Sequence, residues 1–123
     1  MKNKIAALGI AGLLTLTISG CASGPTKLQN VYEICGLNQG SNLADEGKTL
    51  IIDMMGEEDY VGASYSDVSC VVNDTDLAMP DYIVSAIETT RALDGRQSGD
   101  WEGFEAQWSY HPDSGLDLVI HQK

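Results

Sequence analysis

Apolar and polar side chains alternate near the C-terminus, and this pattern limits the fold more than any other feature of the chain. Successive side chains of a strand point to opposite faces, so the alternation predicts half-buried strands over 104–111 and 116–122. The segment HPDSG between them is typical of a turn, because Pro112 fixes φ and Gly115 can adopt a positive φ. The expected inward residues are Phe104, Ala106, Trp108 and Tyr110 in the first strand and Leu116, Leu118 and Ile120 in the second.

Further strands are predicted ahead of this hairpin in the sequence. A turn signal at Glu102–Gly103 predicts a strand over 96–101, so the C-terminal strands form a β-hairpin or a three-strand meander. The short, apolar and partly β-branched segment 48–55 predicts another strand, which Gly56 ends. The polar, glycine-rich segment 37–47 is interpreted as a loop.

Helical patterns occupy the rest of the chain ahead of the C-terminal strands. Segment 28–35 has apolar residues at i, i+3, i+4 and i+7, with Thr26 as the expected N-cap and Gly36 as the expected stop. A second helix follows Ser64, which has capping-box spacing to Asp67.

A third helix is expected to begin with Pro80 as its first residue, where the missing N–H is harmless. Its expected buried stripe comprises Tyr82, Ile83, Ala86, Ile87 and Thr90. The sum is an α+β fold, in which short helices pack on one face of a small antiparallel sheet.

The N-terminus has the layout of a secretory signal rather than of a folded element. Lys2 and Lys4 precede an apolar run, 5–18, that is too short to span a bilayer core, which needs about 20 residues. The tetrapeptide ISGC, which ends at Cys21, resembles the lipobox of bacterial lipoproteins. In that family the cysteine thiol carries a diacylglycerol, and cleavage occurs just before the cysteine.

The resemblance implies three parts of the chain. Residues 1–20 are a cleaved lipoprotein signal peptide, residues 21–27 are a lipidated N-terminus and tether, and residues 28–123 are a single small domain. The protein is then expected at the cell envelope, lipid-anchored to the membrane and facing outside the cytoplasm. No cofactor is expected besides the covalent diacylglycerol on Cys21.

Charge excludes one class of partner. Acidic residues number eighteen, and the formal net charge of −11 becomes −13 when Lys2 and Lys4 leave with the signal peptide. Such a domain is repelled by phosphate backbones, so nucleic-acid binding is not expected. The acyl chains, rather than the domain surface, are expected to contact the membrane.

With Cys21 lipidated, Cys35 and Cys70 remain as an even pair in an oxidising compartment. We expect a disulfide between them, which would close a loop of about 36 residues and stabilise the domain by roughly 3.5–4 kcal/mol. The functional alternative is a metal-binding or redox thiol pair, for which neither a C-x-x-C motif nor a neighbouring histidine is present.

Four carboxylates, Asp53, Glu57, Glu58 and Asp59, are the densest acidic set and the weak calcium candidates of this chain. The alternative is a solvated loop, which is favoured because EF-hand spacing is absent. The segment 73–76, NDTD, begins like a calcium loop, but the residues that follow it are apolar.

His111 and Asp113 could form a base with an orienting carboxylate, although no serine or cysteine lies in a nucleophile-elbow pattern. The favoured alternative is a turn histidine that bonds the local backbone. His121 is expected near the opposite end of the hairpin. Trp101 adjoins a turn and is expected to be partly exposed, so it joins His111 and Asp113 as a possible binding surface.

The stretch 89–118, with its TRALDG and YHPD-GL segments, and the two cysteines are similar to those of small exported actinobacterial proteins, many of them lipoproteins. This resemblance supports the domain boundaries and the disulfide and implies no chemistry. We therefore expect a non-enzymatic binding or interaction domain whose partner is an envelope protein or glycan. The alternatives are a small hydrolase or metal-dependent enzyme using His111 with acidic residues, and an envelope calcium binder.

Overall fold

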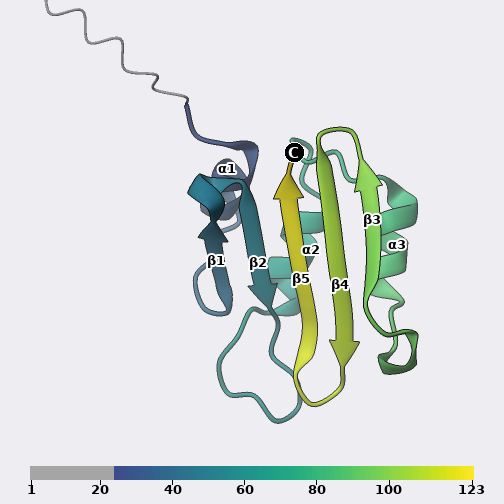
Figure 1. The fold of residues 1–123 in the computed structure, drawn as a ribbon. Coiled ribbons are helices and arrows are strands. Elements are labelled where there is room, and N and C mark those ends of the chain that lie inside the picture. The colour runs from purple at the N-terminus through teal and green to yellow at the C-terminus, as the bar shows by residue number, and fades with distance from the viewer. Residues whose placement is uncertain (1–23) are drawn as a thin grey trace, which may run out of the picture.

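β5 (Gly115–Gln122) is the central strand of a five-stranded antiparallel sheet in the computed structural model, which describes residues 24–123 (Figure 1). The strand order is β1-β2-β5-β4-β3, and every neighbouring pair is antiparallel. The other elements are α1 (Lys27–Ile34), β1 (Ser41–Ala44), the 3₁₀ helix η1 (Asp45–Gly47), β2 (Thr49–Asp53), α2 (Tyr65–Val72), α3 (Asp81–Glu88), the 3₁₀ helix η2 (Ala92–Asp94), β3 (Gln97–Trp101) and β4 (Phe104–His111).

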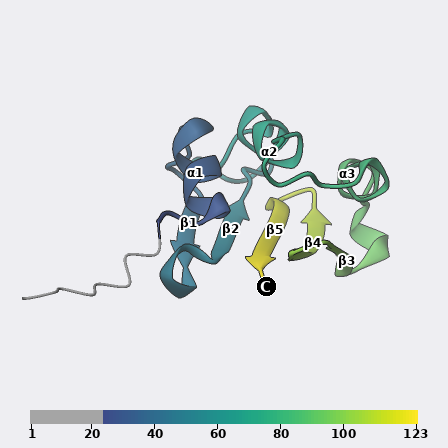
Figure 2. The same cartoon turned by 90° about the horizontal axis from the view of Figure 1, so that it is seen from above.

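The three α-helices of this part of the chain cover one face of the sheet and leave the other face open (Figure 2). The predicted α+β class is therefore confirmed. The core lies between the helices and the covered face. Its largest fully buried side chains come from both layers: Leu28, Val31, Leu50, Ile52, Val71, Val72, Leu77, Ile83, Trp108, Leu118 and Ile120.

The C-terminal meander has the predicted arrangement. Trp108 pairs with Leu118 across β4 and β5, and both side chains are buried, whereas the neighbouring pair Gln107 and Val119 points to the open face. β3 joins β4 through the turn predicted at Glu102–Gly103.

Capping fixes the ends of the first two helices. Thr26 and Gln29 form a capping box at α1, and Ser64 and Asp67 form the predicted capping box at α2. A disulfide joins Cys35, the C-cap of α1, to Cys70 in α2, with their Cα atoms 5.9 Å apart. The predicted structural pairing of these cysteines is confirmed.

Three local predictions are wrong. The segment 37–47 contains β1 and η1 rather than only a loop. Pro80 is the N-cap of α3, with φ −61° and ψ 142°, and the helix begins one residue later. Tyr82 is 67% exposed, because it lies on the side of α3 that faces away from the sheet, although it was expected in the buried stripe.

Trp101 also differs from the prediction, since only 8% of it is exposed. Its ring stacks on Phe104 with centroids 5.6 Å apart, and its Nε1–H donates to the carbonyl oxygen of Leu77 over 2.9 Å. The chain between α2 and α3, near Leu77, covers the indole, although the turn beside it is exposed. Trp101 is therefore a core residue.

Cys21 and the predicted signal peptide lie outside the described residues. Within residues 24–123, none of the helices has the length and apolar character needed to cross a membrane.

Candidate binding site at the distal end of the sheet

The sheet has two ends with different surroundings. At the proximal end the chain enters at Gly24, and the Thr26 hydroxyl donates to the carbonyl oxygen of Gly47. At the distal end β4 turns into β5 through the segment 112–114 (Figure 1). β4 has eight residues, so the two ends are roughly 23 Å apart at about 3.3 Å per residue.

The acidic segment that follows β2 is fixed to the distal turn by backbone hydrogen bonds. The N–H of Glu57 donates to the carbonyl of Pro112 over 3.0 Å, and the N–H of Glu58 donates to that of Asp113 over 3.1 Å. A Cβ atom on Gly56 would lie 2.2 Å from the Asp113 carbonyl oxygen, so only glycine allows this approach.

This contact brings together most of the residues that the sequence marked. His111 and Asp113 of the distal turn lie at the same end as the calcium candidates Asp53, Glu57, Glu58 and Asp59. Trp101 lies at the proximal end, where the turn between β3 and β4 is found, and is not part of this surface.

His111 is bonded to its local backbone, as the favoured interpretation expected. The N–H of Asp113 donates to its Nδ1 over 3.2 Å, which places the proton of a neutral ring on Nε2. The Asp113 carboxylate is 3.8 Å from the same Nδ1, and both side chains are more than half exposed. Because Nδ1 accepts from the backbone, Asp113 does not orient an Nδ1–H as the carboxylate of a catalytic triad does.

Asp53 and Asp117 lie directly opposite one another on β2 and β5, on the open face. Partial burial, and then the negative charges of Asp117 and Asp59, raise the pKa of Asp53 above its usual value. Arg96 lies 3.1 Å from Asp117 and forms a half-exposed ion pair with it. Among residues 24–123, no three His, Cys, Asp or Glu side chains are grouped so that they could hold a metal ion.

Exposed apolar side chains adjoin these carboxylates. Tyr60 is 95% exposed and Val61 66% exposed in the segment fixed to the distal turn, and Leu93 in η2 is 94% exposed. Large apolar side chains this exposed commonly mark contact surfaces when they gather in one region. From the sequence this segment was predicted to be a charged loop. Tyr60 and Val61 fit neither a helical nor an alternating pattern of apolar residues, and this could have indicated that they are exposed.

A cavity of about 420 Å³ lies at the same end of the sheet, on the face that the helices cover, where α2, the end of α3 and the distal ends of β4 and β5 meet. We call it the distal cavity. Its inner wall includes the buried side chains of Val68, Ile87 and Leu116, and Tyr65 lines it while remaining 66% exposed. An apolar interior with a few polar groups at its edge is typical of a binding pocket.

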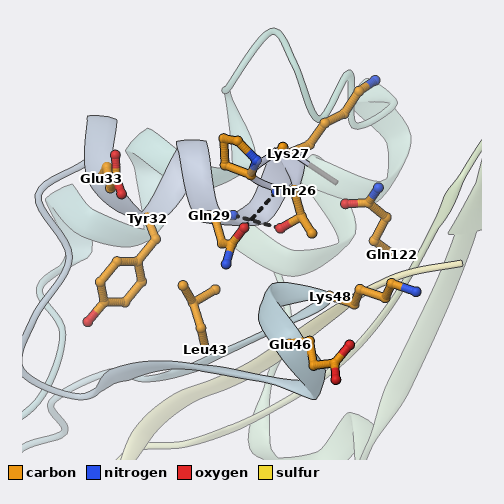
Figure 3. A pocket seen from close by; sticks show the side chains of 11 residues that line it. Thr26, Lys27, Gln29, Tyr32, Glu33, Leu43, Glu46, Lys48 and Gln122 are labelled. Carbon is orange, nitrogen blue, oxygen red and sulfur yellow. Dashed lines mark hydrogen bonds between the residues drawn. The ribbon is translucent and has the colours of Figure 1, made fainter. Parts of the chain in front are cut away.

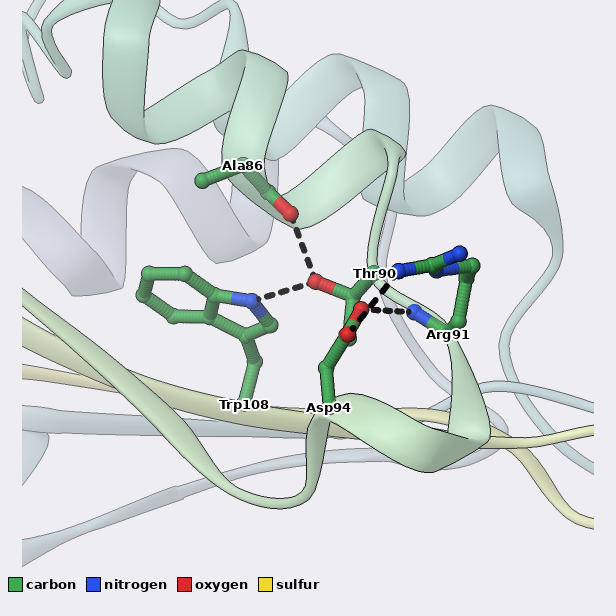
Figure 4. Close-up of polar contacts among 5 residues, drawn as sticks. All are labelled: Ala86, Thr90, Arg91, Asp94 and Trp108. Atoms are coloured by element: carbon green, nitrogen blue, oxygen red, sulfur yellow. Dashed lines mark hydrogen bonds and ion pairs between the residues drawn. The ribbon is translucent and has the colours of Figure 1, made fainter.

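Thr90 and Arg91, the first two residues of TRALDG, line the distal cavity, and polar contacts of this segment hold it in place (Figure 4). The Thr90 hydroxyl donates to the Ala86 carbonyl over 2.5 Å and accepts from Nε1–H of Trp108 over 2.8 Å. The backbone N–H of Arg91 donates to the Asp94 carboxylate over 2.8 Å, which lowers the pKa of Asp94 below its usual value. This segment therefore has a structural role in joining α3 to β3.

A second cavity, of about 980 Å³, lies at the proximal end between α1 and η1 (Figure 3). Its lining mixes cations, carboxylates and amides and includes Lys48, Glu46 and Gln122. Gln29 extends from α1 toward it and is held by Thr26, whose backbone N–H donates to Oε1 over 2.7 Å. This wide polar groove lacks the buried apolar wall of the distal cavity.

A side-chain network on the open face of the sheet was not predicted from the sequence. The Thr49 hydroxyl lies 2.6 Å from the Asp45 carboxylate and 2.8 Å from Nδ1 of His121. A hydroxyl has one proton, so Thr49 donates to the carboxylate and accepts from Nδ1–H of His121. Asp45 and Glu46 have φ of 51° and 58°, and the network fixes this left-handed turn to β5.

In comparisons with known proteins, no family model, curated sequence or solved structure is significantly similar to this chain.

Proposed function

We propose that this protein is a lipid-anchored component of the cell envelope and that residues 24–123 form a non-enzymatic binding domain. A diacylglycerol on Cys21 would hold it to the membrane, on the side that faces outside the cytoplasm. The ISGC tetrapeptide, the basic start and the short apolar run support this part of the proposal.

The position of the exposed apolar residues is the main support for a binding role. The chain enters the domain at the proximal end, whereas Tyr60, Val61 and the distal cavity lie at the other end of the sheet. A short N-terminal tether would leave the proximal end nearest the membrane. The distal end would then face away from the membrane and be available to a partner.

The chemistry of this end favours a protein partner over a nucleic acid. Exposed tyrosines are among the side chains that contribute most to protein interfaces. The surrounding carboxylates, which include Glu57 and Glu58, would repel a phosphate backbone. We therefore propose an envelope protein as the partner.

Anchoring is tested by intact mass of the protein purified from the native membrane fraction. The expected species begins at residue 21 and carries the mass of a diacylglycerol on Cys21, with or without an amide-linked acyl chain. A Cys21→Ser form should remain unprocessed or be released from the membrane. An unmodified chain in the soluble fraction would contradict the proposal.

A further inference from the structure

We infer that the distal end recognises a basic segment of its partner and that one bulky apolar side chain of this segment enters the distal cavity. This inference rests on the proposed function and names the chemistry of the partner. Two independent features of the described residues, charge and cavity shape, support it.

The distal end carries more negative than positive charge. Arg91 and Arg96 lie near this end, and each already has a carboxylate neighbour, Asp94 at 3.5 Å and Asp117 at 3.1 Å. The remaining carboxylates outnumber them: Asp53, Glu57, Glu58, Asp59 and Asp113. A basic segment complements this surface, and its association should weaken as salt increases.

The distal cavity provides a place for one side chain of the partner, which surface charge alone does not provide. Its volume of about 420 Å³ is near the lower limit for binding pockets, so it suits one or two side chains rather than an extended ligand. Val68, Ile87 and Leu116 are each at least 94% buried and give it an apolar interior. Tyr65 at its edge offers an exposed ring for stacking.

Other exposed apolar side chains lie at the same end of the sheet. Tyr60 and Val61 are exposed in the segment fixed to the distal turn, and Leu93 is exposed two residues after Arg91, which lines the cavity. A partner that places one bulky side chain in the cavity would also have these apolar residues and the carboxylates of the distal end to contact. This arrangement resembles the apolar centre and charged rim of protein interfaces.

The test uses the full protein purified in a nonionic detergent and three fluorescent hexapeptides, with binding followed by anisotropy. The peptides are Lys-Lys-Trp-Leu-Lys-Lys, its serine version Lys-Lys-Ser-Ser-Lys-Lys, and its acidic version Glu-Glu-Trp-Leu-Glu-Glu. We expect the first to bind at least about tenfold more tightly than either of the others. Equal binding of the two basic peptides would overturn the inference, because charge alone would then explain it.

Matched tyrosine variants locate the cavity contact. Tyr65→Ser and Tyr82→Ser each remove a ring from the first turn of a helix, and the two tyrosines are 66% and 67% exposed. We expect Tyr65→Ser to weaken binding of the tryptophan peptide about tenfold and Tyr82→Ser to change it less than twofold. Equal effects would overturn the inference.

Matched charge variants locate the basic contact. One triple variant neutralises the distal segment: Glu57→Gln, Glu58→Gln and Asp59→Asn. The control removes the same charge away from the distal cavity: Asp76→Asn, Glu102→Gln and Glu105→Gln. We expect about tenfold weaker binding of the tryptophan peptide to the first and less than about threefold to the second; equal losses would contradict a distal site.

The two proposals fail in different ways. If Cys21 carries no lipid, the proposed anchoring fails whatever the peptides do. If the peptides bind without the predicted preferences while the distal end still contacts an envelope protein in cells, only the partner's chemistry is wrong. Capture of a glycan at the distal end would likewise overturn the basic-segment inference.

Discussion

The backbone N–H of Glu58 donates to the carbonyl oxygen of Asp113 over 3.1 Å, and this bond fixes the segment after β2 to the turn between β4 and β5. The two residues are far apart in the sequence, and neither belongs to a strand. Their contact places exposed Tyr60 and Val61 at the distal end of the sheet, the same end as the distal cavity. The proposed binding surface therefore depends on this loop-to-turn contact.

Gly56→Ala should disrupt that contact. The new Cβ would lie 2.2 Å from the Asp113 carbonyl oxygen, so the segment or the turn must move. Overpacking of this kind costs about 1–3 kcal/mol, and each kcal/mol lowers Tm by about 4–8 °C in a domain of this size. Gly24→Ala is the control, because its Cβ would contact nothing, and an equal loss of Tm in both variants would contradict the argument.

Asp53→Asn should stabilise the protein at neutral pH. Burial and the charges of Asp117 and Asp59 raise the pKa of Asp53 in the folded state above that in the unfolded chain. The folded protein therefore takes up the proton first, and its stability falls as pH rises through the window between the two pKa values. Removing the like-charge cross-strand pair should add about 0.5 kcal/mol at pH 7.

The gain from Asp53→Asn should diminish as pH falls below the raised pKa, where the wild-type carboxyl is also neutral. Thermal unfolding of both proteins between pH 3 and pH 7 measures this. The Asp113→Asn variant removes a charge from the distal turn without altering the β2–β5 pair and is the control. A gain that does not depend on pH would contradict electrostatic repulsion as its cause.

Thr49→Val should destabilise the fold by removing the hydroxyl between Asp45 and His121. Thr49 is 7% exposed, whereas Asp45 is exposed and His121 is half-buried, so water can reach the partners that lose a bond and the cost should be about 1 kcal/mol. Thr89→Val is the matched control, since its hydroxyl is exposed and bonds only Ser85. We expect Tm to fall by several degrees in the first variant alone, and the Nδ1–H resonance of His121 to broaden.

Calcium should leave Tm unchanged. A filled site at 100 times its Kd would add about 2.7 kcal/mol to the free energy of unfolding, a shift that thermal unfolding detects easily. Within residues 24–123 the carboxylates are not grouped in threes, so we expect equal Tm values in millimolar CaCl₂ and MgCl₂. A rise with calcium alone would instead support the calcium-binding alternative based on Asp53, Glu57, Glu58 and Asp59.

Local patterns in the sequence predicted much of the fold. The alternation over 104–111 and 116–122 specified both strands and their inward faces, because a strand has a period of two and only one face is buried. The capping box at Ser64 located the start of α2 for a similarly local reason. The disulfide between Cys35 and Cys70 was predicted from the export expected for this chain and from the even number of cysteines that remain besides Cys21.

Features that depend on long-range register were not predictable. β1 has only four residues and no alternating apolar run, and it is recognisable only by its pairing with β2. The bond from Thr49 to His121 joins residues 72 positions apart. Trp101 is buried because the chain near Leu77 covers it, which no property of the turn beside it indicates.

The candidate site was predicted in part. His111, Asp113 and the acidic segment were marked as possible binding residues, and the structure places them at one end. The exposure of Tyr60 and Tyr65 could not be predicted, since it is set by how α2 and the distal turn pack. The distal cavity could not be predicted either, because it forms only where α2, α3, β4 and β5 meet.

Site-specific photo-cross-linking in intact cells tests the central claim most directly. A photoreactive phenylalanine replaces Tyr60 in one strain and Tyr82 in another, so that two exposed tyrosine positions are compared in the same full-length protein. The account predicts one discrete protein adduct from position 60 and none of that mass from position 82. The same adduct from both positions, or no adduct from position 60, would contradict a binding surface at the distal end.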